Sequence, residues 1–306
     1  MKMINKYFKK RVFNSKAIKA PHFLKNDLLN LLQPNIDKLK ENLDATSKKY
    51  IDFCIYSLIH LPTNNGYNAN IEAFKSKNFT YPQWLLDLYK SYQDKSKLYY
   101  FGHGLDIMPT KVKTYIENKI AFDLGSFDGG SALMLSKNYN FSHIHSFDIS
   151  LINMEKIKAN LKKQDSKKNI TLHHLALGDK IKSFEFEDNG EVGTKLNFAP
   201  KNNKVIVNQS TLDIFMKDYP KDTIGFIKMD IEESEMDCLR GARESIIKDR
   251  PVLAVSIYHN LDQFFNAKVF LQSLNLNYKF MIVPCYLSRH TTIIETNLLA
   301  YPEELA

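Results

Sequence analysis

The sequence has few cysteines and no long apolar run, and both shortages restrict the classes of protein it can be. Its 306 residues include three widely separated cysteines, Cys54, Cys238 and Cys285, in no CxxC or Cys/His metal spacing. Such cysteines are typical of buried thiols in a reducing compartment. No apolar run approaches the ~20 residues of a membrane-spanning helix, and the basic N-terminus lacks the apolar core of a secretory signal. We therefore expect a cytoplasmic protein.

Most of the chain also lacks net charge. The formal net charge is +8, but seven of the 42 basic residues and no acidic residue fall within residues 1–20, which leaves 35 basic and 34 acidic residues elsewhere. A near-neutral body does not favour a nucleic-acid partner. The tail is typical of a solvated, disordered segment. With its aromatic residues Tyr7, Phe8 and Phe13, its alternative role is a weak contact with the anionic inner face of a membrane.

The pattern of the chain predicts three segments, which are residues 1–20, 21–115 and 116–306. After the basic tail, apolar residues between 22 and 62 recur at helical spacing, interrupted by Pro34 and Pro62. Residues 63–66 have the composition of a loop, and a further helix is expected to begin at Pro82. The region 21–115 is therefore expected to be α-helical.

From about residue 119, short apolar strands alternate with helices. We expect a hairpin within 179–210, helices through Met154–Leu161 and over 234–247, and strands at 120–122, 144–147, 170–177, 224–229, 252–258, 278–283 and 291–300. Repeated strand–helix units predict an α/β fold with a mostly parallel sheet covered by helices on both faces. Ligands bind at the carboxyl ends of the strands in such folds.

The segment after the first strand lacks the GxGxxG of dinucleotide-binding enzymes. It reads Asp123-Leu124-Gly125-Ser126-Phe127-Asp128-Gly129-Gly130, whose glycines would let the backbone approach a nucleotide closely. Carboxylates at Asp123 and Asp128 would repel a pyrophosphate, but they suit the ammonium and sulfonium of S-adenosylmethionine. Asp148 ends the second strand 25 residues after Asp123, where an acid can accept hydrogen bonds from ribose hydroxyls. The alternative is an acidic turn and a helix cap.

A second acidic segment, Lys228-Met229-Asp230-Ile231-Glu232-Glu233-Ser234-Glu235, follows the fourth main strand. Acids in a first helical turn are favoured by the helix dipole, which is a structural interpretation of this run. Asp230 also stands where this strand would deliver a side chain to a reaction centre. Both interpretations can hold together.

These segments resemble those of the FkbM methyltransferase family. The likeness covers residues 119–302, and it includes the two acidic segments, Thr211-Leu212-Asp213, Val255-Ser256-Ile257-Tyr258-His259 and residues 295–302, in the family's order. The resemblance implies a Rossmann-like class I methyltransferase fold with a mostly parallel seven-stranded sheet. It implies S-adenosylmethionine as cofactor and a hydroxyl of a sugar, glycan or related small molecule as acceptor. The implied cofactor-binding residues are Asp123, Gly125, Ser126, Asp128, Gly129, Asp148 and Ala176, and the implied catalytic residues are His259, Asp230 and Glu232.

Two positions depart from the family's pattern. Glu233-Ser234 stands where the family has glycine and a small residue, and glycine allows backbone geometry that Glu233 adopts only at a cost. Asp148-Ile149 replaces the family's Glu-Pro. Both departures bear on acceptor geometry.

A poor nucleophile such as an alcohol needs a base or a metal. His259 is the first candidate for the base and Asp230 the second. A divalent ion between Asp230, His259 and Asn260 is a third scheme, but no metal is expected. The rival functions are a nicotinamide-dependent oxidoreductase, a nucleotide-sugar-dependent glycosyltransferase using Asp230 and Glu232, and a non-catalytic adapter that keeps the fold.

Overall fold

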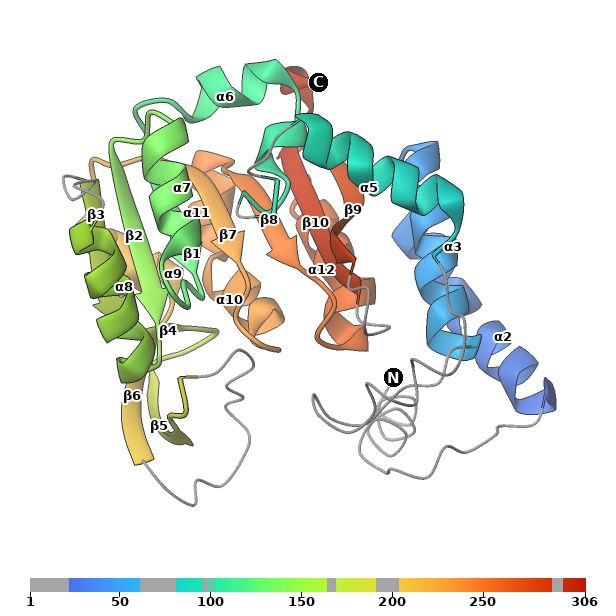
Figure 1. The fold of residues 1–306 in the computed structure, drawn as a ribbon, viewed down its shortest axis with the longest axis horizontal. Helices are drawn as coiled ribbons and strands as arrows, with labels where there is room; N and C mark the ends of the chain where they lie inside the picture. The colour runs from blue at the N-terminus through green and yellow to red at the C-terminus, as the bar shows by residue number, and fades with distance from the viewer. Residues whose placement is uncertain are drawn as a thin grey trace.

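The protein is a three-layer α/β structure, with a twisted sheet between two layers of helices (Figure 1). A computed structural model describes residues 22–60, 81–95, 99–100, 102–163, 169–190, 204–287 and 294–306. The basic tail, Pro62 and the loop expected at 63–66 lie outside these residues.

The main sheet has seven strands in the order β3-β2-β1-β7-β8-β10-β9. The strands are β1 Ile120–Leu124, β2 His143–Asp148, β3 Ile170–His174, β7 Ile224–Met229, β8 Val252–Ser256, β9 Tyr278–Leu287 and β10 Ile294–Pro302. The first five in spatial order are parallel, and β10 runs antiparallel to both of its neighbours. Every residue of β1, β7 and β8 is buried, as apolar strands covered on both faces should be. The expected fold class is confirmed.

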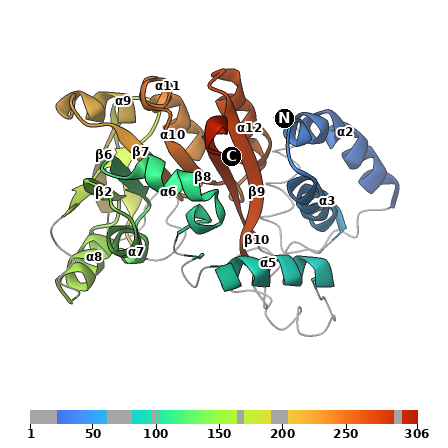
Figure 2. The same ribbon diagram turned by 90° about the horizontal axis from the view of Figure 1, so that it is seen from above.

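Alternate residues of β1 face opposite helix layers. Ile120, Phe122 and Leu124 of β1 belong to the core shared with the helices that follow β6 and β7, whereas Ala121 belongs to the other core. The first layer contains α9 Leu212–Phe215, α10 Glu235–Gly241, α11 Arg243–Asp249 and α12 Leu261–Ser273, and the second contains α6 Thr110–Ile116, α7 Gly130–Asn138 and α8 Leu151–Lys163. Figure 2, seen from above, shows the two layers on opposite sides of the sheet.

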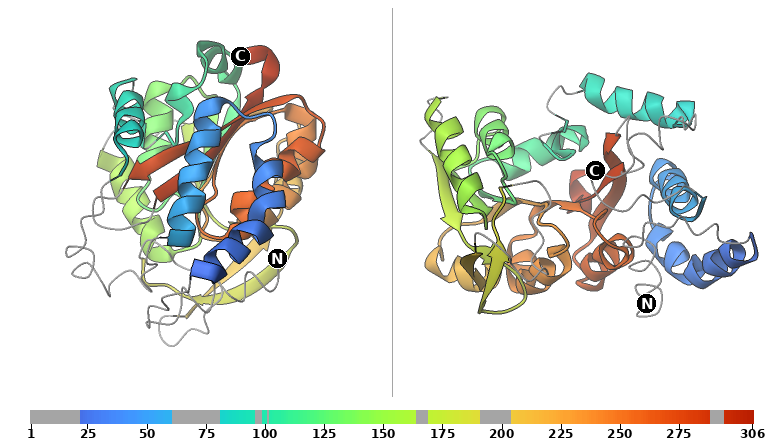
Figure 3. Two further views of the ribbon diagram at one scale, coloured as in Figure 1. Left: turned by 90° about the vertical axis from the view of Figure 1, so that its right-hand side faces the viewer. Right: turned by 60° about the horizontal axis from the view of Figure 1, so that its bottom comes forward.

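The N-terminal helices α2 His22–Lys40 and α3 Ala45–His60 lie at the β9 end of the sheet (Figure 3). They share the α9–α12 core, and Ser47 Oγ on α3 accepts a hydrogen bond from the backbone N–H of Ile282 on β9 at 3.0 Å. Tyr50 reaches across to Thr296 with 2.8 Å between their oxygens. This packing covers a strand that would otherwise be an exposed edge.

The helix expected from Pro82 is α5 Gln83–Lys95, which confirms its position to within one residue. Pro34, in contrast, does not break its helix, because α2 continues through it to Lys40. Leu32, Ile36 and Leu39 are buried on one face of α2, and this tertiary burial outweighs the hydrogen bond that proline removes.

Two expected elements are divided. The helix expected over 234–247 is split at Ala242, whose backbone is not helical (φ −106°, ψ 6°). Next to this break, a Cβ at Gly241 would lie 1.9 Å from the carbonyl oxygen of Gly178. The strand expected over 170–177 leaves the main sheet after His174, and its remainder, β4 Ala176–Leu177, pairs in a second sheet. The helix α6 falls in the region expected to be α-helical, whereas α9 and α12 are additional to the helices expected.

The second sheet has the order β4-β6-β5. Its strands β5 Lys182–Glu187 and β6 Lys204–Ser210 are antiparallel, with Phe184 opposite Val207 and Phe186 opposite Val205, which confirms the expected hairpin. In the part of the chain that the structure describes, no helix has the length and apolar character to span a membrane.

Candidate functional site

The turn after β1 is fixed by contacts with both neighbouring strands. Gly125 has a φ of +80°, and a Cβ there would lie 1.8 Å from the backbone oxygen of Asp230. The N–H groups of Gly125 and Ser126 both donate to the oxygen of Phe147 at 3.0 Å. Glycine is therefore required at 125 by its conformation and by the close approach of β7.

Asp123 is fully buried below this turn and is paired within the protein. Its Oδ1 lies 3.1 Å from Lys228 Nζ, and its Oδ2 accepts a hydrogen bond from Ser131 Oγ at 2.8 Å. Lys228 also donates to the carbonyl oxygens of Leu124 and Gly125, at 3.2 and 2.6 Å. The Asp123 charge is thus neutralised by Lys228, and the pair holds the turn in place.

The next predicted residues shape the start of α7. Ser126 is buried, and its hydroxyl lies 2.5 Å from that of Ser146. Asp128 accepts the N–H of Gly130 at 2.9 Å through its side chain. Gly129, with a φ of +81°, precedes the helix, and a Cβ there would lie 2.9 Å from Ile157. The side chain of Ser126 points into the core, whereas Asp128 is half-buried.

Asp148 lies directly beside this turn. Its two carboxylate oxygens accept backbone hydrogen bonds from Phe127, at 2.9 Å, and from Ser150, at 2.8 Å. Burial raises the pKa of Asp148, although these N–H groups act in the opposite direction. The side chain of Asn153 also donates to Oδ1, at 3.4 Å. Because a carboxylate offers about four acceptor positions, about one remains for a ligand. Ala176, buried in β4, lies two residues beyond His174, the residue that pairs with Asp148 across β2 and β3.

The three predicted catalytic residues meet at the carboxyl ends of β7 and β8. His259 Nε2 lies 3.5 Å from Asp230 Oδ1 and 3.4 Å from Glu232 Oε2. The His259 side chain is 6% exposed, against 22% for Asp230 and 23% for Glu232. Asp230 and Glu232 therefore present more surface to an incoming molecule than His259 does.

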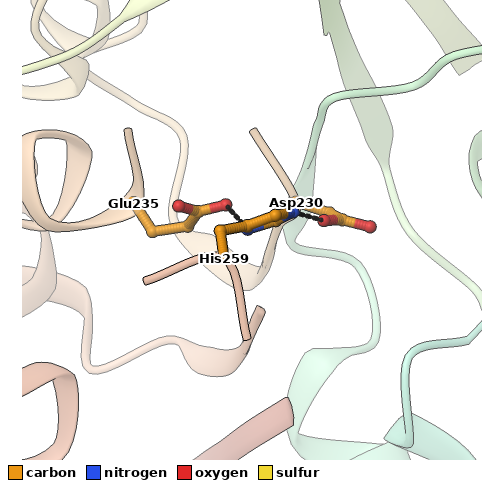
Figure 4. Close-up of side chains that lie close together, drawn as sticks. All are labelled: Asp230, Glu235 and His259. Atoms are coloured by element: carbon orange, nitrogen blue, oxygen red, sulfur yellow. Dashed lines mark ion pairs between the residues drawn. The ribbon is translucent and has the colours of Figure 1, made fainter. Parts of the chain in front are cut away.

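Glu235 completes this group and was not among the predicted site residues. Its side chain is fully buried, and its Oε1 lies 3.1 Å from His259 Nδ1. It accepts hydrogen bonds from the N–H of Ile231 at 2.8 Å and from the side chain of Gln263. Figure 4 shows the His259 ring between the carboxylates of Glu235 and Asp230. The sequence could have indicated Glu235 only through its position in the acidic segment. An acid in the first turn of a helix is also explained by the helix dipole.

The charges of the group shift one another's pKa values. Burial alone would lower the pKa of His259, but the carboxylates of Glu235, Asp230 and Glu232 raise it to about 9. Burial would raise the pKa of Asp230, but Lys228 and His259 together bring it below its usual value. Burial and the charge of Asp230 raise the pKa of Glu295, at the start of β10, to about 7. The edge of the sheet is therefore rich in carboxylates.

The loop that carries Glu232 has an unusual backbone. Glu232 and Glu233 have φ values of +53° and +76°, in the left-handed region that glycine adopts most easily. Glu233 stands where the family has glycine, and its backbone adopts the left-handed conformation that glycine favours. Asn260, a member of the alternative metal scheme, instead caps α12 by accepting the N–H of Gln263 at 3.0 Å.

Comparison of this chain with known proteins identifies one matching family and one solved structure with a similar fold. A family model described as the methyltransferase FkbM domain matches residues 123–280. A methyltransferase FkbM from Methylobacillus flagellatus KT has a similar fold, with a TM-score of 0.58 and 18% identity over 90% of this chain and 60% of that protein. This chain therefore spans 60% of that protein's length. None of the curated proteins matches the chain.

Two further solved structures are more distant. A putative O-methyltransferase from Klebsiella pneumoniae has a TM-score of 0.40 and 9% identity over 91% of this chain and 96% of its own. A putative methyltransferase from Streptococcus mutans, in complex with SAH, has a TM-score of 0.40 and 13% identity over 62% of this chain and 93% of its own.

Proposed function

This chain belongs to the FkbM methyltransferase family, and from that premise we propose that it transfers the methyl group of S-adenosylmethionine to a hydroxyl of a sugar, glycan or related small molecule. The observation that carries the proposal is the meeting of two groups at one edge of the sheet. The Gly125 turn beside Asp148 packs directly against the backbone of Asp230, which belongs to the acidic group around His259. The family does not favour the glycosyltransferase or the adapter.

The cofactor half of the site rests on Asp148. Its remaining acceptor position suits a ribose hydroxyl of a nucleoside. Asp128 and Gly129 lie at the start of α7, next to the same turn. Asp123 contributes through Lys228, by holding the turn rather than by touching the ligand. A sulfonium would be favoured by the negative potential of Asp230, Glu232 and their neighbours.

The acceptor half rests on Asp230, Glu232 and His259. Catalysis requires the acceptor oxygen and the cofactor methyl to be held in near-attack geometry. The sequence ranks His259 first as the base, but the greater exposure of Asp230 favours Asp230 as the group that meets the acceptor hydroxyl. His259 then orients Asp230 through the contact at 3.5 Å.

The test is methyl transfer from labelled S-adenosylmethionine to a panel of neutral, acidic and amino sugars. His259→Ala and Asp230→Asn should each lower kcat by about 10²–10⁴-fold, the range for loss of a proton-transfer group, while affinity for S-adenosylhomocysteine changes little. Asp237→Asn on the exposed side of α10 is the matched control, since it removes one charge outside the group. Full activity in both site variants would contradict the assignment.

We also propose a cytoplasmic location and an acceptor that is not a nucleic acid. These proposals rest on the nearly neutral charge of residues 21–306 and on the scattered cysteines. All three cysteines are free thiols, and Cys238 and Cys285 are buried.

A further inference from the structure

His259 occupies a closed position between two helices and two strand ends. Its ring is 6% exposed, and carboxylate oxygens lie on both of its edges, from Glu235 beside Nδ1 and from Asp230 and Glu232 beside Nε2. In Figure 4 the labelled side chains point toward one another from α10 and from the segments that follow β7 and β8.

Neither ring nitrogen of His259 makes a hydrogen bond, although both are buried. The carboxylate oxygens lie 3.1–3.5 Å away, but not in the direction that a ring N–H requires. A buried polar atom without a hydrogen bond is rare and calls for an explanation, such as an ion that the surrounding groups bind.

The donor atoms are spaced as the ligands of one ion would be. One ligand atom each from Asp230, Glu235 and His259 lies within 4.8 Å of the others. Two ligands on opposite sides of an ion are about 4–4.6 Å apart when each bond is about 2.0–2.3 Å. Because Glu235 lies beside Nδ1 and Asp230 beside Nε2, the His259 ring would have to turn so that one of its nitrogens faces the ion. Carboxylate oxygens with one imidazole suit Mn²⁺, Zn²⁺ or Fe²⁺.

Size and charge favour a small cation over an organic one. Glu235 is fully buried, so a bulky ammonium could not reach it, whereas Asp230 and Glu232 are open to solvent on one side and would admit an ion. The three carboxylates carry more negative charge than His259 can neutralise.

We propose that Asp230, Glu235 and His259 bind one divalent cation at the carboxyl ends of β7 and β8. Glu232, whose Oε2 also lies 3.4 Å from Nε2, is the nearest group that could supply a further ligand. The site goes beyond the proposed methyl transfer, for which the sequence predicts no metal. The ion would lie beside the exposed face of Asp230, where it could polarise an acceptor oxygen.

The experiment is a titration of chelator-treated, full-length protein with Mn²⁺, followed by electron paramagnetic resonance of free Mn²⁺. We expect one ion per chain, and binding weaker by at least about 10–100-fold in Asp230→Asn and in Glu235→Gln, since loss of an outer-shell partner alone has an effect of that size. Asp237→Asn, on the same helix as Glu235 but 44% exposed, should bind like the wild type. Because no cofactor or acceptor is added, the outcome is independent of methyl transfer.

A second measurement needs only the wild-type protein, in case the variants fail to fold. Electron spin-echo modulation of bound Mn²⁺ should show coupling to an imidazole nitrogen, from His259. Absence of stoichiometric binding in the wild type would overturn the proposal and leave His259 as a histidine held by carboxylates alone. Equal affinity in Asp230→Asn and Asp237→Asn, or bound Mn²⁺ without nitrogen coupling, would also overturn it.

Discussion

Replacing Glu233 by glycine should stabilise the protein. Glu233 has a φ of +76°, and a residue with a Cβ in this region costs roughly 1–2 kcal/mol. Glycine avoids that cost but loses about 0.5–1 kcal/mol of backbone entropy on folding. The gain in the free energy of unfolding expected from the backbone alone is therefore about 0.5–1 kcal/mol.

Glu233→Ala is the matched control, because it removes the same charge and the same side-chain contacts but keeps the Cβ. At an ordinary position alanine is more stable than glycine by about 0.5–1 kcal/mol. At residue 233 the order should be inverted, with Glu233→Gly the more stable of the two by a similar amount. The difference in stability between the two variants therefore reports the effect of the backbone conformation at residue 233.

Urea unfolding of both variants gives the measurement. The slope m should be unchanged, so that a shift in the midpoint reports stability alone. In thermal unfolding, the difference corresponds to roughly 2 °C for a chain of this size. If Glu233→Ala proves as stable as Glu233→Gly or more so, the left-handed backbone at 233 is not strained, and the reasoning is refuted.

Three further predictions concern the cofactor half and the sheet. Asp148→Ala should weaken S-adenosylmethionine binding by about 1.5–3 kcal/mol, through loss of charge-assisted hydrogen bonds; unchanged affinity by calorimetry in a folded variant would count against the role of Asp148. Gly125→Ala should lower the free energy of unfolding by about 2–5 kcal/mol, since it combines a left-handed backbone with a contact of 1.8 Å to Asp230; a denaturation midpoint equal to the wild type would contradict this. Burial lowers the pKa of His145 to about 3 and that of His173 to about 4. Below pH 6.5 the unfolded chain therefore binds protons that the folded chain does not, and stability should fall as the pH falls toward 4. The slope should be up to about 1.4 kcal/mol per pH unit for the buried His145 and smaller for the more exposed His173. His145→Phe should flatten that dependence between pH 4.5 and 6.5, and an identical slope would exclude His145 as its source.

The sequence by itself determined the class and order of the elements in residues 119–302. Buried parallel strands need continuous apolar runs, and these are visible locally at 120–122 and 224–229. The same logic brought Asp230 and His259 together, because the carboxyl ends of parallel strands meet at one edge of the sheet. The glycine expected at 233 also pointed to a left-handed backbone, which Glu233 adopts.

The pairing of charges depended on tertiary structure. Asp123 was expected to attract a cationic ligand, but it stands directly opposite Lys228 in the register of β1 and β7. That partner lies 105 positions later in the chain, and no local pattern specifies which strands become neighbours. From the sequence, Glu235 is likewise only an acid in the first turn of a helix. The orientation of α10 in the fold places its carboxylate beside His259.

Tertiary packing also explains why a helix end expected from the local sequence was not observed. Pro34 predicts a helix end, but the burial of Leu32, Ile36 and Leu39 in a helix that packs on α3 and α12 keeps α2 continuous. The helix expected over 234–247 divides at Ala242, next to Gly241, which packs against the backbone of Gly178. Propensity and periodicity are properties of neighbouring residues, whereas a buried contact, an ion pair and a shifted pKa depend on residues that only the fold brings together.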